Sequence, residues 1–246
     1  MTVVVPAERL VLVHGFTQTA RSWTGVVARL PARYEAVAVD APGHGDAGAL
    51  ATDLTGAAVE VVRAGGAGAY VGYSMGARIC LHAALARPDA VERLVVISGT
   101  AGIDDAAERA ARRASDEALA DTIERDGVDA FLERWLAQPL FATLPATARD
   151  VDDRRRNTAS GLAASLRRAG TGTQAPLWDR LGELAVPVLL VAGALDPKFV
   201  ALAERMHGAL ARSELAVVAD AGHTVHLEQP DAFAEVLVDW LARTDP

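Results

Sequence analysis

Six short runs of mainly β-branched and other apolar residues recur along the chain. They are RLVLVH (Arg9 to His14), EAVAVD (Glu35 to Asp40), AYVGY (Ala69 to Tyr73), RLVVIS (Arg93 to Ser98), PVLLVAG (Pro187 to Gly193) and ELAVVAD (Glu214 to Asp220). Longer stretches with helical spacing lie near Ser22 to Leu30, Thr52 to Ala64, Gly76 to Arg87, Ala201 to Leu210 and Asp231 to Ala242. Near-continuous apolar strands joined through helices are typical of a parallel sheet covered on both faces. The pattern therefore predicts an α/β fold.

The alternation stops between about Thr100 and Ala185. No strand is expected there, and the sequence is typical of several amphipathic helices rich in Ala, Asp, Glu and Arg. Ligands of α/β proteins bind at the carboxyl edge of the sheet, so an all-helical insertion is expected to lie over that edge. We predict that residues 1–99 and 186–246 form the core and that residues 100–185 form a helical lid.

Composition limits the kinds of partner. The 246-residue chain has a net charge of −8, which gives no basic surface for nucleic acid or an anionic membrane. No apolar run approaches the ~20 residues of a membrane span, and the start, MTVVVPAERL, lacks a basic signal-peptide region, so a cytoplasmic location is expected. The single cysteine, Cys80, cannot form an internal disulfide. Lys198 is the only lysine, and the preference for arginine can reflect codon usage alone.

The third apolar run ends in Gly72-Tyr73-Ser74-Met75-Gly76, and helical spacing follows at once. A strand, the pattern G-x-S-x-G and a helix, in that order, match a nucleophile elbow, in which a tight turn lifts a serine hydroxyl above the sheet. The two glycines permit the strained turn and the close packing of helix on strand. We predict that Ser74 is catalytic; an ordinary glycine-rich turn is the alternative.

A serine hydroxyl needs a base and a carboxylate that orients the base, and in this architecture they follow in the order Ser, acid, His. Asp196 and His223 each come just after an expected strand, which places them at the same edge as Ser74. We predict these two as the acid and the base. His226 is the rival base, although beside LEQP it is expected to pack locally. Asp220 is the rival acid, at the end of its own strand.

An oxyanion is stabilised by backbone N–H groups, one from the residue after the nucleophile and one from a loop after an early strand. Met75 and Phe16 occupy these two positions, so we predict that they form the oxyanion hole. His14, next to this loop, is expected to brace it. His44, in the turn-rich stretch DAPGHGDA, is expected to be structural as well.

The stretches VHGF, DAPGHGDA, GYSMG, GALDPKF and AGHTVHLEQP, as an ordered set, resemble the α/β-hydrolase superfamily. GYSMGAR, ERAARRASDEALA, FLERWLAQPLF and RRRNTASG are similar to the 2-succinyl-6-hydroxy-2,4-cyclohexadiene-1-carboxylate synthase family of menaquinone biosynthesis, and the similarity runs nearly end to end. The resemblance implies an α/β-hydrolase fold with a helical lid. It also implies a lyase that removes pyruvate from 2-succinyl-5-enolpyruvyl-6-hydroxy-3-cyclohexene-1-carboxylate without a cofactor or metal.

The same resemblance implies a set of substrate-binding residues. They are Tyr73 beside the nucleophile, the arginines Arg78, Arg112 and Arg156, and the lid aromatic Trp135. Arg78 follows Ser74 by one helical turn, close enough to hold a carboxylate in a bidentate fork. Residues 101–185 hold twelve Arg against fifteen Asp and Glu, so most of these arginines are expected to be solvated. Arg113, Arg154 and Arg155 remain alternatives, as does core packing for Trp135.

In this family a triad of the kind predicted here removes a ring proton, with Ser74 as the base in this sequence, while backbone donors stabilise the charge and pyruvate leaves. The leading alternative is a serine hydrolase of a small ester or a C–C bond substrate, with Ser74 as a covalent nucleophile. A non-enzymatic protein on the same fold is a third possibility. The expected partner is a small anionic substrate, and the sequence leaves the oligomeric state open.

Overall fold

The computed structural model describes residues 7–244, and within them six strands form one sheet in the order β2-β1-β3-β4-β5-β6. The strands are β1 (Glu8–Val13), β2 (Tyr34–Val39), β3 (Gly68–Tyr73), β4 (Val91–Ile97), β5 (Val188–Gly193) and β6 (Ser213–Val218). Every neighbouring pair is parallel. The predicted α/β fold is therefore confirmed, and each expected strand lies within two residues of its observed bounds. The expectation drawn from the first residues of the chain falls partly on residues 1–6, outside the described residues.

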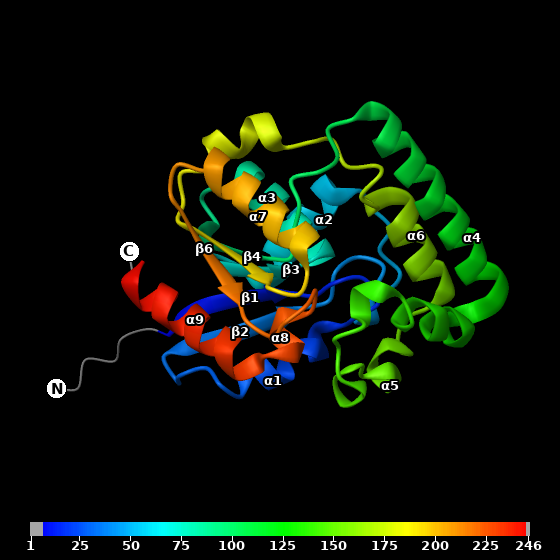
Figure 1. Cartoon of the computed structure of the whole chain (residues 1–246), viewed down its shortest axis with the longest axis horizontal. Coiled ribbons are helices and arrows are strands. Elements are labelled where there is room, and N and C mark those ends of the chain that lie inside the picture. Colours follow the sequence, from blue (N-terminus) through cyan, green and yellow to red (C-terminus); the bar gives the residue numbers. More distant parts are fainter. Residues whose placement is uncertain (1–6, 245–246) are drawn as a thin grey trace.

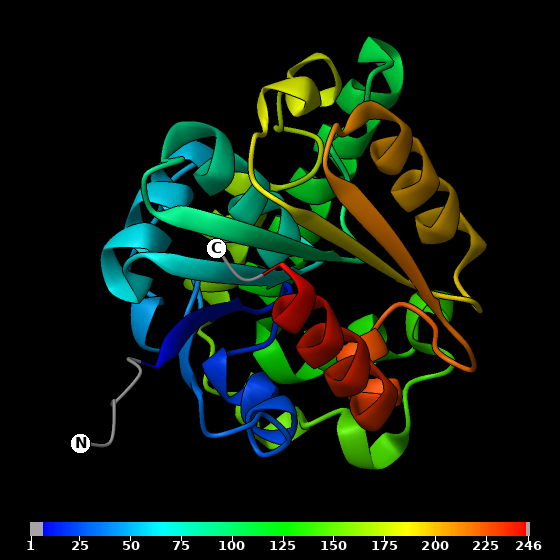
Figure 2. The same ribbon diagram turned by 90° about the vertical axis from the view of Figure 1, so that its left-hand side faces the viewer.

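Helices cover both faces of the sheet (Figures 1 and 2). On one face lie α2 (Leu54–Gly65), α3 (Met75–Ala86) and α7 (Pro197–Ala209), and on the other lie α1 (Thr24–Val27) and α9 (Pro230–Arg243). A further one-turn helix, α8 (Val225–Glu228), and the 3₁₀ turns η1 (Ala20–Trp23) and η2 (Gly45–Ala47) lie in the loops. The helix expected over residues 22–30 is shorter than predicted. Gly25 within it and Pro31 just after it both disfavour a longer helix.

The two-sided cover explains why the strands are continuously apolar. In β1, Val11 and Val13 pack on the α2–α3 face, whereas Leu10 and Leu12 pack on the α1–α9 face. All four side chains are fully buried, and burial of each contributes roughly 1.5–3 kcal/mol to folding. An alternating polar and apolar strand would leave polar groups in one of the two cores.

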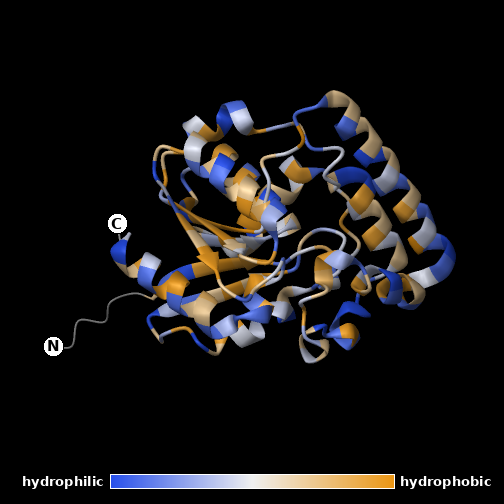
Figure 3. Cartoon of the chain, viewed as in Figure 1, coloured by the Kyte–Doolittle hydropathy of each residue, from blue (hydrophilic) through white to orange (hydrophobic). Residues whose placement is uncertain are grey.

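Between β4 and β5 the chain forms helices but no strand. They are α4 (Ala106–Leu136), α5 (Val151–Arg154) and α6 (Ala159–Ala169), with the 3₁₀ turns η3 (Pro139–Phe141), η4 (Ala146–Ala148) and η5 (Trp178–Glu183). In Figure 1, α4 and α6 lie side by side at one end of the molecule, away from both termini, and Figure 3 shows polar residues along the outside of α4. These helices bury an apolar cluster of their own, which includes Ile123, Phe131 and Leu162. Gly127, at φ 79°, breaks the helical geometry of α4.

The described residues include no helix that is long and apolar enough to cross a bilayer.

The packing of α3 on β1 gives a stability prediction at Gly76. A Cβ there would lie 2.6 Å from the carbonyl oxygen of His14, and the Val13 carbonyl oxygen is closer still. Because both neighbours are backbone atoms, Gly76→Ala should destabilise the fold by about 3 kcal/mol or more and lower the Tm by roughly 6 °C or more. Gly208→Ala is the matched control, since a Cβ at this position in α7 meets nothing within 4 Å. It should stabilise by about 0.5–1 kcal/mol. Calorimetric Tm values that are equal for the two variants would contradict this account.

Candidate active site

Ser74 lies at the turn between β3 and α3 in a strained backbone conformation. Its φ is 51° and its ψ is −104°, which a non-glycine residue adopts only when its surroundings enforce it. The enforcement comes from the flanking glycines. A Cβ at Gly72 would lie 2.5 Å from the carbonyl oxygen of Gly76, so the strand and the helix approach more closely than any larger residue allows. This local geometry is that of the predicted nucleophile elbow.

Three side chains from three strand ends form a hydrogen-bonded chain. His223 Nε2 lies 3.1 Å from Ser74 Oγ, and His223 Nδ1 lies 3.0 Å from Asp196 Oδ2. Ser74 follows β3, Asp196 follows β5 and His223 follows β6, and the carboxyl ends of these strands share one edge of the sheet. When Nδ1 donates its proton to the carboxylate, Nε2 is free to accept the serine proton. The structure thus brings together the three residues that the sequence predicts as catalytic.

Asp196 and His223 are each held by further contacts. Asp196 caps α7, because its Oδ1 accepts a hydrogen bond from the Phe199 N–H at 3.3 Å while its Oδ2 faces His223. The His223 ring is buried between aromatic rings, with the Phe199 centroid at 4.4 Å and the Tyr73 centroid at 5.4 Å. The imidazole is therefore oriented by packing as well as by hydrogen bonds.

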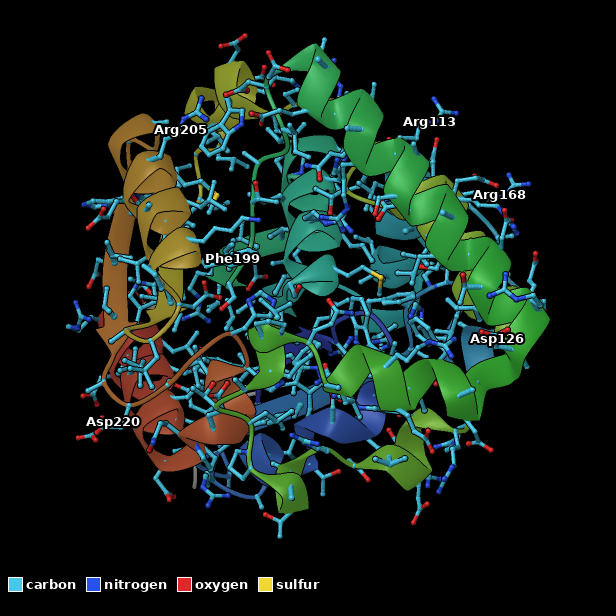
Figure 4. All side chains as sticks on the ribbon, turned by 45° about the vertical axis from the view of Figure 1, so that its right-hand side comes forward. Arg113, Asp126, Arg168, Phe199, Arg205 and Asp220 are labelled. Atoms are coloured by element: carbon cyan, nitrogen blue, oxygen red, sulfur yellow. The ribbon has the colours of Figure 1, made fainter. Side chains whose placement is uncertain are left out.

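The rival residues lie elsewhere. His226 is buried between Trp23 and Tyr73, with both ring centroids 4.5 Å away, and neither of its nitrogens has a hydrogen-bond partner among the described residues. Burial, together with the positive charge of Arg154, lowers the pKa of His226 to about 3. Asp220 is an exposed turn residue at φ 56°, at the outer edge of the molecule in Figure 4. Neither contacts Ser74.

Two backbone N–H groups are available beside Ser74. Within residues 7–244, neither the Phe16 nor the Met75 N–H donates to another residue of the chain, and both residues line the cavity next to Ser74. Met75 is the first residue of α3, where the helix dipole favours negative charge. His14, by contrast, is fully buried and joins two loops, since its Nε2 accepts from the Ala41 N–H at 3.0 Å. It acts as the expected brace.

A cavity of about 160 Å³ opens at Ser74 and His223. Its walls are largely aromatic and aliphatic, with a few hydroxyl groups and three cations. The lining residues are Phe16, Tyr73, Ser74, Met75, Arg78, Ser98, Thr100, Arg112, Trp135, Leu140, Phe141, Ser165, Leu166, Ala169, Gly170, Thr171, Lys198, Phe199 and His223. No described Asp or Glu is among them. Both the core and the segment 100–185 contribute, and Ser165 on α6 reaches Met75 Sδ at 3.6 Å.

Arg78 and Arg112 are neighbouring cations, and a single carboxylate, that of Asp116, lies beside them. Arg112 Nε donates to Asp116 Oδ1 at 2.8 Å, whereas Arg78 is buried and donates only to neutral acceptors, the Ala169 carbonyl oxygen at 2.9 Å and the Gln174 side chain at 3.4 Å. Burial and the neighbouring Arg112 charge lower the pKa of Arg78 to about 10, so it remains charged at pH 7. The pair therefore keeps an uncompensated positive charge at the cavity wall, which an anionic ligand can neutralise.

The structure does not bring Arg156 to this cavity. Its guanidinium pairs with Asp46 at 3.1 Å and with Asp153 at 3.6 Å, and it is absent from the lining residues. The family resemblance placed it at the substrate, and these two carboxylates hold it elsewhere. The neighbouring alternatives do not line the cavity: Arg154 is buried and donates to the Arg149 carbonyl oxygen at 2.7 Å and to the Thr17 hydroxyl, and Arg155 pairs with Asp129 at 2.7 Å. Arg113 does not line the cavity either.

Trp135 and Tyr73 do line the cavity, as the resemblance implies. The Trp135 ring packs on Phe16, with centroids 5.3 Å apart, and on Phe131, at 5.7 Å, so it serves both the cavity wall and the apolar cluster of α4 and α6. The Tyr73 ring packs against the rings of His223 and His226. Trp135 therefore packs in the apolar cluster and also lines the cavity, and its contact with a substrate stays a prediction.

Comparison with known proteins agrees with this geometry. The model of the alpha/beta hydrolase family matches residues 10–236. A Bacillus subtilis (strain 168) protein provisionally named 2-succinyl-6-hydroxy-2,4-cyclohexadiene-1-carboxylate synthase is 37% identical over 96% of this chain and 90% of its own. The synthase of that name from Serratia proteamaculans (strain 568) is 34% identical over 94% of this chain and 92% of its own.

The chain belongs to this synthase family of alpha/beta hydrolases. A structure of MenH from S. aureus superposes with a TM-score of 0.91 at 28% identity and covers 99% of this chain and 97% of that one. An esterase from Thermogutta terrifontis matches with a TM-score of 0.82 at 20% identity, covering 98% of this chain and 92% of that one. At that identity the match shows the fold alone.

The described residues contain no cluster of three His, Cys, Asp or Glu placed to hold a metal ion.

Several lining residues of this member of the synthase family were not predicted from its sequence. Ser98 follows β4 directly, is buried at φ 46°, and its hydroxyl has no partner among the described residues. Its place at the end of an apolar run is the signal that marks it. Lys198 and Phe199 lie within GALDPKF, two and three residues after Asp196, and both line the cavity.

The two buried nitrogens of His226 give a pH prediction. The ring takes up a proton in the unfolded chain near pH 6.5 but not in the folded one, so the unfolded state binds more protons below that pH and stability falls as the pH falls. His226→Phe keeps the stacked ring and removes this titration. At pH 5 the wild type should lose roughly 2 kcal/mol relative to the variant, and at pH 7.5 the two should be similar. Urea unfolding at both pH values measures the difference, and parallel pH profiles would contradict it.

Proposed function

We propose that this chain catalyses the reaction of its family. It removes pyruvate from 2-succinyl-5-enolpyruvyl-6-hydroxy-3-cyclohexene-1-carboxylate and forms 2-succinyl-6-hydroxy-2,4-cyclohexadiene-1-carboxylate. The observation that carries the proposal is the cavity in which the Ser74, His223 and Asp196 chain faces two arginines that share one carboxylate, Asp116. A hydrolase of neutral esters has no use for that charge. We place the reaction in the cytoplasm, in line with the composition of the chain.

Comparison of the chemical structures of the substrate and the product gives the electron flow. His223 takes the Ser74 proton, and the Ser74 oxygen then removes the proton from ring carbon 2, next to the succinyl carbonyl group. The electron pair forms the bond between carbons 2 and 3, the former 3,4 double bond moves to carbons 4 and 5, and the bond from carbon 5 to the enolpyruvyl oxygen breaks. The leaving enolate takes up the proton held by the His223 imidazolium and becomes pyruvate, which returns the enzyme to its starting state. Because Ser74 acts only as a base, no acyl-enzyme forms.

Backbone donors carry the charge of this step. As the proton leaves carbon 2, negative charge develops on the succinyl carbonyl oxygen, where the N–H groups of Phe16 and Met75 are available. Such preorganised donors contribute about 3–4 kcal/mol each to transition-state stabilisation. Asp196 stabilises the imidazolium that His223 becomes. In this proposal residues 100–185 act as the lid and bring Arg112 and Trp135 to the substrate.

The triad assignment predicts that Ser74→Ala and His223→Ala each reduce pyruvate release by roughly 10⁴- to 10⁶-fold, because the residues act as a unit. His226→Phe should retain most of the activity, since its ring does not reach Ser74. A coupled assay for pyruvate measures all three variants. If Ser74→Ala kept a tenth of the wild-type rate, the elbow serine would not be catalytic.

The arginine pair predicts a substrate-dependent defect. A charge-assisted hydrogen bond contributes about 1.5–3 kcal/mol, so Arg78→Ala should lower kcat/KM for the precursor, which carries three carboxylates, roughly 10- to 100-fold. Arg78→Lys should recover only part of this loss, because one ammonium does not reproduce the guanidinium fork. Slow hydrolysis of a neutral nitrophenyl ester by the same preparations should change only a few-fold, which controls for misfolding. A rapid burst of nitrophenol with no pyruvate from the precursor would instead favour the serine hydrolase.

A further inference from the structure

Lys198 is the one lysine among 24 basic residues. The chain uses arginine at every other basic position but keeps a lysine here. Lys198 also lines the cavity beside Ser74. It is the second residue of α7, which begins at Pro197 directly after Asp196. Its side chain is exposed at the rim of the cavity.

No contact within the described chain explains a cation at this position. Among residues 7–244, Lys198 makes no ion pair or hydrogen bond, and its Nζ lies 5.8 Å from the centroid of the neighbouring Phe199 ring. The first turn of a helix disfavours a cation, because the helix dipole is positive there. The carboxylate of Asp196 does not compensate for it, since its oxygens face His223 and the Phe199 N–H.

Arg205 on the same helix shows the contrast. It pairs with Asp104 and stacks on the Trp178 ring, with its guanidinium carbon 3.6 Å from the ring centroid. It lies seven residues beyond Lys198, two turns along nearly the same side of α7, and outside the cavity. In Figure 4 Arg205 reaches the surface, whereas Phe199, next to Lys198, points to the interior.

The charges of the cavity fit a ligand with more than two anionic groups. Three cations line it, from α3, α4 and α7, and no described carboxylate does. The precursor in the proposed function carries three carboxylates, on the succinyl chain, the enolpyruvyl group and the ring. Arg78 and Arg112 are neighbours, whereas Lys198 comes from the helix whose first turn packs on His223 through Phe199.

We infer that Lys198 binds a substrate carboxylate on the α7 side of the cavity, separate from the carboxylate or carboxylates bound by Arg78 and Arg112. This inference rests on the proposed function and deepens it, because it makes a third carboxylate part of what the enzyme recognises. The flexible stem suits a rim position, where the ammonium follows the ligand as it enters. Lys198 determines affinity and specificity, and it does not touch the bonds that change.

The test measures affinity apart from turnover. Calorimetric binding of the precursor is compared in Ser74→Ala, Ser74→Ala/Lys198→Gln and Ser74→Ala/Arg205→Gln proteins. The Lys198 variant should bind roughly 10-fold more weakly, and the matched Arg205 variant should bind like Ser74→Ala alone. In the active enzyme, Lys198→Gln should raise KM by a similar factor with kcat changed less than about three-fold, and it should weaken the salt dependence of kcat/KM. Lys198→Arg should restore most of the affinity.

The outcomes separate the two proposals. Equal affinities in the Ser74→Ala and Ser74→Ala/Lys198→Gln proteins would overturn the Lys198 assignment and leave the lyase reaction in place. A loss as large in the Arg205 variant would also overturn it, because the effect would then be a general one of net charge. Absence of pyruvate release by the wild type would overturn the proposed function instead.

Discussion

The close approach of α3 to the sheet is the constraint on which the site depends. Gly72 of β3 lies against the backbone of α3, and Gly76 of α3 lies against the carbonyl groups of Val13 and His14. Ser74, between the two glycines, is forced into a conformation that it would not adopt alone. That conformation aims its hydroxyl at His223 and starts a helix at Met75, whose N–H has no acceptor within residues 7–244. The position of the Ser74 hydroxyl and the N–H that we propose as an oxyanion donor are thus two results of one packing contact.

The charge of the cavity is opposite in sign to the net charge of the protein. The protein is acidic as a whole, yet its cavity is lined by cations and by no described carboxylate. Arg78 is costly to bury because its nearest acceptors are neutral, and the lowered pKa reflects that cost. In the proposed reaction a substrate carboxylate would offset this cost, so folding itself carries part of the cost of forming the binding site.

The core and the triad could be predicted from the sequence because local patterns determine them. Continuous apolar runs are specific to two-sided burial, and a serine between two glycines at a strand end has few other uses. The position of Arg156 could not be predicted in this way. In a segment with twelve arginines and fifteen acidic residues, the partner of each depends on which helices pack together, and Asp46, 110 residues away, is not visible in any local pattern. The same holds for the break of α4 at Gly127, which the expected series of amphipathic helices does not locate.

Asp196 has two duties at once, as the cap of α7 and as the partner of His223. Loss of a cap of this kind costs a helix about 1 kcal/mol, whereas Asn, Ser, Thr or Gly would keep most of the cap, but none of these carries the charge that an imidazolium needs. A replacement such as Asn therefore keeps the start of α7 and removes the charge beside His223, and an apolar replacement removes both. This double requirement leaves the loop after β5 little freedom to vary in sequence.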